Sequence, residues 1–254
     1  MCGFGRRSAG PARGAGRRAD RSTAAAAGAI MSELDRPVWA SLQHQLHWGV
    51  GDGRARRFKA DINRFAATPD EGADNLCALA ALVQPGDDAV FLAQVPPIVV
   101  PPGLIAVKEA LGVQMVATQA LAPGEDLQVL GDADAAEMLA LATLTEPGPF
   151  LPRTHTMGRF IGIRIDGRLA AMAGERMRFP GYVEVSGVCT HPDFRGRGLA
   201  RRLSAAVTAD IQRRGEQAFL HAWTANTAAI ALYESLGFVT RAMVNIAVLK
   251  RRPS

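Results

Sequence analysis

The residues best suited to chemistry form a short loop that leads into an amphipathic segment. The loop reads Arg195-Gly196-Arg197-Gly198-Leu199-Ala200, and a helix is predicted to follow it. Its two glycines leave room where a ligand would approach the backbone, and the free amides at a helix start favour a phosphate or pyrophosphate. Arg195 and Arg197 could add positive charge. The loop therefore predicts an anion-binding site, although a tight strand-to-helix turn would also use glycine.

Three kinds of nucleotide site compete for this loop. A Walker A loop requires Gly-Lys-Ser/Thr, which the sequence does not contain. A dinucleotide fingerprint requires Gly or Ala where Arg201 stands, and an acid near the end of the next strand, which instead ends His221-Ala222-Trp223. A nicotinamide-dependent oxidoreductase is therefore disfavoured. The third site is one for coenzyme A, with its pyrophosphate on this loop and its pantetheine arm beside the preceding strand.

Two motifs in this region resemble those of the GNAT N-acetyltransferase superfamily. The pyrophosphate motif of that family, Gln/Arg-x-x-Gly-x-Gly/Ala, is matched by Arg195, Gly198 and Ala200. A second match lies downstream and comprises Asn226, Ala229 and the run Leu232-Tyr233-Glu234-Ser235-Leu236-Gly237-Phe238. The resemblance covers roughly residues 126–250. It rests on two motifs in the right order and separation.

The resemblance implies a set of coenzyme A contacts. Backbone groups of Val188, Cys189 and Thr190 would hydrogen-bond the pantetheine as an added strand does. Arg195 would lie at the entrance of the pyrophosphate site. The pyrophosphate itself would be held by the backbone amides of Gly196, Arg197, Gly198, Leu199 and Ala200. Asn226 would help to fix the pantetheine, and its position also suits a helix N-cap. The strands around Val188 and Phe219 would splay apart, and the thioester would lie in the opening.

Glu184 is the candidate base for the reaction. An alkylammonium group titrates near pH 10, so an amine acceptor must lose a proton before it attacks, and a carboxylate can take that proton. Glu184 precedes Val188 by four residues on a predicted strand, which places both side chains on one face. Some GNAT enzymes place a catalytic glutamate at this position. The alternative is a solvated or salt-bridged glutamate.

Tyr233 is the candidate acid that protonates the departing thiolate, a role that the family gives to tyrosine at this position. It follows Asn226 by seven residues, about two helical turns, so both would face the same ligand. A packing role on an amphipathic helix is the alternative. The amide of Val188 could donate to the thioester oxygen. A covalent route through Cys189 stays open but is disfavoured, because no histidine is placed to act as its base.

The elements that position these residues follow from periodicity and turn signals. Leu199, Leu203, Val207 and Ile211 repeat every four residues, and Gly215 ends that helix. Asp166-Gly167 is a strong two-residue hairpin signal. Helices are predicted over 133–144, 198–214 and 226–236, and strands over 126–130, 159–165, 169–175, 182–190, 217–223 and 238–249. This order predicts a mixed α/β fold with an antiparallel hairpin first and one helical crossover later.

The segment before residue 123 carries no catalytic motif. It predicts helices over 39–48, 75–83 and 108–112, a strand over 89–95, and a proline-bounded edge or loop at 98–100. We expect this segment to pack against the later residues and to shape the acceptor pocket. The loop over 146–158, with Phe150, Arg153 and His155, would edge the same pocket, and Arg153 could bind a substrate carboxylate.

Composition limits the remaining classes. The chain has 254 residues, 48% hydrophobic and 21% charged, which excludes a collagenous, coiled-coil or wholly disordered protein. Residues 1–30 hold six arginines and one acid, so the rest is balanced, with 23 basic and 23 acidic residues. The net charge of +5 therefore comes from this leader and gives no warrant for nucleic-acid binding. Three scattered cysteines predict neither a disulfide framework nor a zinc site, and favour a reducing, cytoplasmic compartment.

Together these observations predict an acyltransferase of the GNAT fold with an additional N-terminal α/β segment. Residues 1–30 would be a disordered leader, 31–122 an accessory segment, and 123–254 the N-acetyltransferase domain. The expected reaction is direct transfer, in a ternary complex, from acetyl-CoA to a primary amine of a small molecule or peptide. No metal, nucleic acid or membrane partner is expected, and a homodimer is compatible with the family. The alternative is a non-catalytic acyl-CoA-binding or regulatory module.

Overall fold

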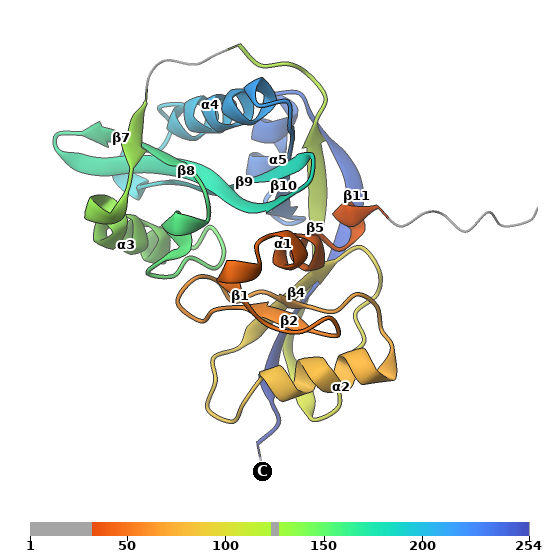
Figure 1. The fold of residues 1–254 in the computed structure, drawn as a ribbon. Coiled ribbons are helices and arrows are strands. Elements are labelled where there is room, and N and C mark those ends of the chain that lie inside the picture. The colour runs from red at the N-terminus through yellow and green to blue at the C-terminus, as the bar shows by residue number, and fades with distance from the viewer. Residues whose placement is uncertain (1–31, 123–126, 254) are drawn as a thin grey trace, which may run out of the picture. The chain divides into compact units, whose positions relative to one another are not determined.

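One mixed eight-stranded sheet organises the computed structural model, which describes residues 32–122 and 127–253 (Figure 1). The predicted leader, 1–30, lies outside the described residues. From edge to edge the strands are β4 (Val90–Gln94), β11 (Phe238–Arg251), β5 (Leu104–Ala117), β10 (Gln217–Trp223), β9 (Tyr182–Thr190), β8 (Arg168–Phe179), β7 (Phe160–Ile165) and β6 (Gln128–Leu130). The predicted mixed α/β class is confirmed.

Strands β9 and β10 are the parallel pair of this sheet, and α4 (Leu199–Arg213) is the crossover between them. The apolar residues that repeat along α4 are buried in one core with β5, β8 and β9. Strands β7 and β8 form the predicted hairpin, since Asp166 and Gly167 have φ of 51° and 79°, as a type I′ turn requires. Local turn chemistry and helical periodicity thus fix this half of the sheet.

The sheet opens between β9 and β10. Their pairing runs only from Gln217 opposite Tyr182 to Phe219 opposite Glu184. Beyond that point β10 stays paired with β5, and β9 stays paired with β8. The two strands therefore diverge toward their carboxyl ends, as the predicted splay requires.

The segment before residue 123 contributes to this sheet directly. Strand β5 lies between β10 and β11 and pairs with both, and β4 pairs with the other edge of β11. The strand predicted over 89–95 is confirmed as β4, whereas the helix predicted over 108–112 is wrong, because those residues lie within β5. Pairing with β11 outweighs the weak helical signal of Lys108–Gly112. The domain division at residue 123 stays a prediction, and the sheet itself crosses it.

Helices cover both faces of the sheet (Figure 1). Helices α4 and α5 (Thr227–Glu234) pack on one face, and α1 (Pro37–His44) and α3 (Ala135–Thr145) on the other. A second, three-stranded sheet of β1 (Gly49–Gly51), β2 (Arg56–Phe58) and β3 (Ala66–Ala67) lies with α2 (Ala73–Leu82) in the N-terminal segment. In the described ranges no helix is both long and apolar enough to cross a membrane.

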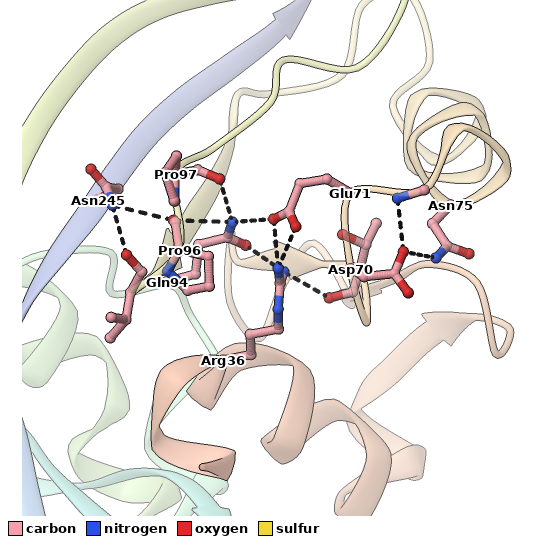
Figure 2. A network of polar contacts seen from close by, with 11 residues as sticks. Arg36, Asp70, Glu71, Asn75, Gln94, Pro96, Pro97 and Asn245 are labelled. Atoms are coloured by element: carbon pink, nitrogen blue, oxygen red, sulfur yellow. Dashed lines mark hydrogen bonds and ion pairs between the residues drawn. The ribbon is translucent and has the colours of Figure 1, made fainter. Parts of the chain in front are cut away.

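A buried polar network ties the N-terminal segment to the edge of the large sheet (Figure 2). Arg36, just before α1, donates from Nη2 to both carboxylate oxygens of Glu71 and from Nη1 to the side-chain oxygen of Gln94 on β4. Gln94 in turn donates to Glu71, and Asn245 on β11 donates to the Val95 carbonyl. The Arg36 side chain is 9% exposed and that of Glu71 29%. These contacts position β4, which supplies part of the cavity wall described below.

Removing Glu71 should cost more stability than removing Arg36. Glu71→Ala leaves a nearly buried guanidinium without its counter-ion, and breaking a fully buried pair in this way costs about 3–5 kcal/mol. Because Glu71 is partly exposed, we expect a loss of about 2–4 kcal/mol in the free energy of unfolding. Arg36→Met should lose about half as much, since Glu71 can turn toward water. Urea unfolding tests the order, and an equal or reversed loss would contradict it.

Candidate active site

A cavity of about 700 Å³ opens where β9 and β10 diverge. The structure brings together around it every predicted catalytic and coenzyme A-binding residue except Glu184. These wall residues are Val188, Cys189, Thr190, Arg195, Gly196, Arg197, Gly198, Leu199, Ala200, Asn226 and Tyr233. The two sequence motifs therefore meet at one place, although the second begins some thirty residues after the first.

The glycine-rich loop forms a cradle at the start of α4. Gly196 and Gly198 have φ of 76° and 71°, and a Cβ built on either would meet no atom within 4 Å. The amides from Gly196 to Arg201 donate to no acceptor among the described residues. Positive φ without a steric neighbour suits a loop whose backbone faces a ligand, and open amides at a 15-residue helix suit an anion. The cradle thus fits the pyrophosphate of coenzyme A.

A bulge in β9 shapes the cavity wall next to the cradle. Two steps along β8, from Gly174 to Met172, face three along β9, from Ser186 to Cys189. Gly187 has φ of 62°, and a Cβ there would lie 2.8 Å from the ring of Phe160. Only glycine fits this conformation and this contact. The bulge leaves Val188 outside the ladder with β8, so its backbone can pair with a ligand, as the pantetheine contact requires.

Tyr233 and Asn226 both reach the cavity from α5. Burial raises the pKa of Tyr233 to about 12, so its hydroxyl keeps its proton near neutral pH and can donate it. Its ring also packs on Phe238, with centroids 5.9 Å apart, so the packing alternative holds as well. Asn226 caps α5, because its side chain accepts a hydrogen bond from the Ala229 amide at 3.1 Å. Its contact with pantetheine stays a prediction.

Cys189 is a poor nucleophile in this setting. Burial raises the pKa of its thiol to about 11, so the thiol is protonated near neutral pH. The reactive form of a cysteine is the thiolate, and no cation in the described part of the chain lowers the pKa of Cys189. The covalent route through Cys189 is disfavoured on this ground.

The surroundings of Glu184 differ from those expected of a base. Its side chain is 1% exposed and accepts four hydrogen bonds: from Arg176 Nε at 2.8 Å, Arg176 Nη2 at 2.9 Å, His221 Nδ1 at 2.8 Å and the Met177 amide at 3.4 Å. Although burial alone would raise the pKa of Glu184, Arg176 and His221 lower it to about 2. A carboxylate with every lone pair engaged does not fit direct proton transfer. The salt-bridged alternative describes Glu184 better, as a residue that positions Arg176 and His221.

The structure adds residues that the motifs did not indicate. Arg176 and His221 line the cavity beside Glu184, and Phe65 and Phe91 reach it from the N-terminal segment. His221 Nε2 lies 3.2 Å from the Gln114 amide nitrogen, which also donates to the Leu34 carbonyl. The Gln114 oxygen accepts from Arg241, so its amide orientation is set and His221 Nε2 must be the acceptor. The sequence indicated His221 only by its place near the end of the strand predicted over 217–223, next to the candidate site.

Only the start of the loop over 146–158 lines the cavity. Its start, from Glu146 to Pro149, lines the cavity as predicted. Phe150 packs edge-on against Phe160, Arg153 pairs with Asp61 at 3.0 Å, and the His155 ring lies 2.8 Å from Asp132. These three side chains are absent from the cavity wall, so the expectation that Arg153 binds a substrate carboxylate is not supported. The described residues also hold no cluster of three or more potential metal ligands.

Known proteins match this sheet and cavity. A family model described as FR47-like protein matches residues 160–246. A crystal structure from the GNAT family of Novosphingobium aromaticivorans superposes with a TM-score of 0.82 and 43% identity, over 88% of this chain and 100% of that one. A mycothiol acetyltransferase of Thermobispora bispora is 49% identical over 67 residues, which are 26% of this chain and 22% of the relative. A ribosomal-protein-alanine N-acetyltransferase of Salmonella typhimurium is 35% identical over 83 residues, 32% and 55% of the two chains.

The fold, the cradle and these matches place the chain among the acetyltransferases. More narrowly, it belongs to the GNAT family, since it spans the full length of a family member at 43% identity. The chain spans about a fifth and about half of the lengths of the two curated relatives.

Proposed function

We propose that this protein transfers an acetyl group from acetyl-CoA to a primary amine while both substrates are bound. The observation that carries the proposal is the cavity between β9 and β10. It joins the glycine cradle to Tyr233 and to a region that we call the second compartment, lined by Phe65, Phe91, Ala93, Arg176 and Ile246. A module that only bound acyl-CoA would need the cradle but no proton donor. The second compartment supplies room for an acceptor.

Coenzyme A would occupy the part of the cavity that runs from the glycine cradle to Tyr233. The amides from Gly196 to Ala200 would bind its pyrophosphate, with Arg195 and Arg197 adding charge. The β9 backbone from Val188 to Thr190, unpaired toward β10, would accept the pantetheine as a short added strand. Asn226, at the other wall, would fix the arm. No metal is needed in this scheme.

The chemistry requires little of the protein beyond orientation and one proton donor. The unprotonated amine nitrogen bonds to the acetyl carbon, the carbon–sulfur bond breaks, and the Tyr233 hydroxyl gives its proton to the departing sulfur. The Val188 amide can donate to the thioester oxygen as charge builds there. The amine proton leaves to solvent in the cavity, because the bonds of Glu184 are fully used. Solvent then returns a proton to Tyr233.

The acceptor would be a small molecule or a peptide amine. The two curated relatives are named for different acceptors, mycothiol and an alanine of a ribosomal protein, so neither name transfers to this chain. The balanced charge of residues 31–254 argues against a nucleic-acid partner, and we place the protein in the cytoplasm without a membrane partner. A homodimer would be usual for the family.

Initial-rate kinetics with acetyl-CoA and a panel of primary amines test the proposal. Direct transfer predicts intersecting double-reciprocal lines, and Cys189→Ala should keep most of the turnover. Parallel lines together with an inactive Cys189→Ala would establish the covalent route instead. Binding of acetyl-CoA without turnover of any amine would favour the regulatory module.

A further inference from the structure

The second compartment is lined by the Arg176 guanidinium and by apolar side chains, with His221 joined to Arg176 through Glu184. Arg176 on β8 lines it together with Phe65, Phe91, Ala93 and Ile246. Phe65 precedes β3, Phe91 and Ala93 lie on β4, and Ile246 lies on β11. This wall belongs mainly to the N-terminal segment and lies apart from the glycine cradle in sequence. An acceptor bound here would meet aromatic and aliphatic surface with a single strong hydrogen-bond donor.

One nitrogen of the Arg176 guanidinium has no hydrogen-bond acceptor among the described residues. Arg176 Nε and Nη2 both donate to Glu184, while Nη1 donates to no acceptor among the described residues. The Arg176 side chain is only 10% exposed, yet Nη1 is not closed off from solvent-accessible space. Because Arg176 lines the cavity, we infer that Nη1 faces into it. A nearly buried donor with no partner is costly, and a ligand oxygen would satisfy it.

The guanidinium is also held in place before any ligand arrives. Glu184 grips it with two hydrogen bonds, and the ring of Phe65 lies 4.9 Å from its central carbon. Glu184 is fixed in turn by His221 and by the Met177 amide. A donor fixed in this way loses little conformational freedom when it binds a ligand, which favours recognition.

We propose that Arg176 recognises an oxygen atom beside the reacting amine of the acceptor, and that the acceptor carries an apolar side chain. The oxygen belongs to a carboxylate or an amide carbonyl, as in an amino acid or the end of a peptide. Nη1 donates to this oxygen, and Phe65, Phe91 and Ile246 pack on the side chain. Arg176 is thus a specificity-determining residue, and Glu184 is a positioning residue that acts through it. This inference rests on the proposed function.

Three matched amines test the inference: phenylalanine, phenylalaninamide and phenethylamine. They share a phenyl group and a primary amine, and differ in bearing a carboxylate, an amide or neither. Calorimetric titration of each into the full chain saturated with coenzyme A measures acceptor binding without turnover. Arg176→Lys keeps a positive charge beside Glu184 but removes the third nitrogen. Arg178→Lys is the control, because Arg178 also lies on β8 but pairs with Glu216 and does not line the cavity.

We expect one or both oxygen-bearing amines to bind about 10- to 100-fold more tightly than phenethylamine, as one charge-assisted hydrogen bond allows. Whichever of phenylalanine and phenylalaninamide binds more tightly shows whether Arg176 recognises a carboxylate or an amide carbonyl. Arg176→Lys should remove the preference, raise KM for that acceptor more than it lowers kcat, and leave binding of phenethylamine and acetyl-CoA unchanged. Arg178→Lys should behave as wild type.

Two results would overturn the inference. One is equal or undetectable binding of all three amines to the wild-type protein. The other is an Arg176→Lys variant that loses phenethylamine turnover as severely as turnover of the other two, because Arg176 would then act on the thioester or on the fold. Preferential binding without any turnover would instead support the inference about Arg176 and refute the proposed acetyl transfer.

Discussion

Tyr233→Phe should lower kcat by about 10²- to 10⁴-fold, the range of a lost general acid. Only the hydroxyl is removed, so packing of the ring against Phe238 survives. Burial keeps the pKa of Tyr233 near 12, which makes its hydroxyl a donor throughout the neutral range. Binding of acetyl-CoA should change less than threefold, because the proton is needed only as the carbon–sulfur bond breaks. Steady-state kinetics and calorimetry measure the two quantities.

Tyr182→Phe is the matched control, since the chain has only two tyrosines. Tyr182 packs on Phe179 and does not line the cavity. We expect its hydroxyl to be dispensable for turnover. A Tyr233→Phe protein that binds acetyl-CoA and turns over at the wild-type rate would remove Tyr233 from the mechanism.

Glu184→Gln should reduce both stability and acceptor recognition. The substitution keeps the shape of the side chain but leaves Arg176 buried without its counter-ion. The pKa of Glu184 falls from 4.5 to about 2 in the folded protein, a difference worth about 3 kcal/mol in the free energy of unfolding at neutral pH. Urea unfolding at pH 7 should show a loss of this size. Because Arg176 also loses its hold, KM for the acceptor should rise as in Arg176→Lys.

The sign of this pH dependence follows from the lowered pKa of Glu184. The folded protein binds a proton at Glu184 less readily than the unfolded chain does, so the stabilisation is complete above about pH 4.5. It is lost as the pH falls from there toward 2. The wild-type protein should therefore lose about 3 kcal/mol more than Glu184→Gln over that window.

Asp61→Asn provides the comparison with an exposed pair. Asp61 and Arg153 are each about half exposed, so breaking their contact should cost about 0.2–1 kcal/mol. The account of Glu184 would fail if Glu184→Gln were as stable as Asp61→Asn. If Glu184→Gln folded normally but lost turnover even at saturating acceptor, Glu184 would be the base.

Much of the coenzyme A half of the site could be predicted, because its determinants are local. Backbone amides, glycine conformation and a helix start all lie within a few residues of Gly198, and short-range spacing records them. The opening between β9 and β10 was implied by the resemblance to the GNAT family. Only the bulge at Gly187 required knowledge of Phe160, which is distant in sequence and fills the space that a Cβ would take.

The acceptor half could not be predicted in this way. Spacing along one strand predicts only that Glu184 shares a face with Val188, whereas the properties of Glu184 come from Arg176 on β8 and His221 on β10. Sheet pairing across long stretches of sequence brings these charges together, and no spacing rule encodes it. Strand β5 shows the same limit, since Lys108–Gly112 has a weak helical signal that pairing with β11 overrides.

Calorimetric titration of the full chain with acetyl-CoA tests the central claim most directly. We expect binding in the micromolar range, no response to NADH, and at least tenfold weaker binding in Gly198→Val. Gly215→Val is the matched control, since Gly215 has φ of 78°, also lacks neighbours within 4 Å of an added Cβ, and follows the far end of α4. It should bind as wild type. Absence of acetyl-CoA binding, or equal binding by both variants, would contradict the assignment of the cradle and the proposed transfer that depends on it.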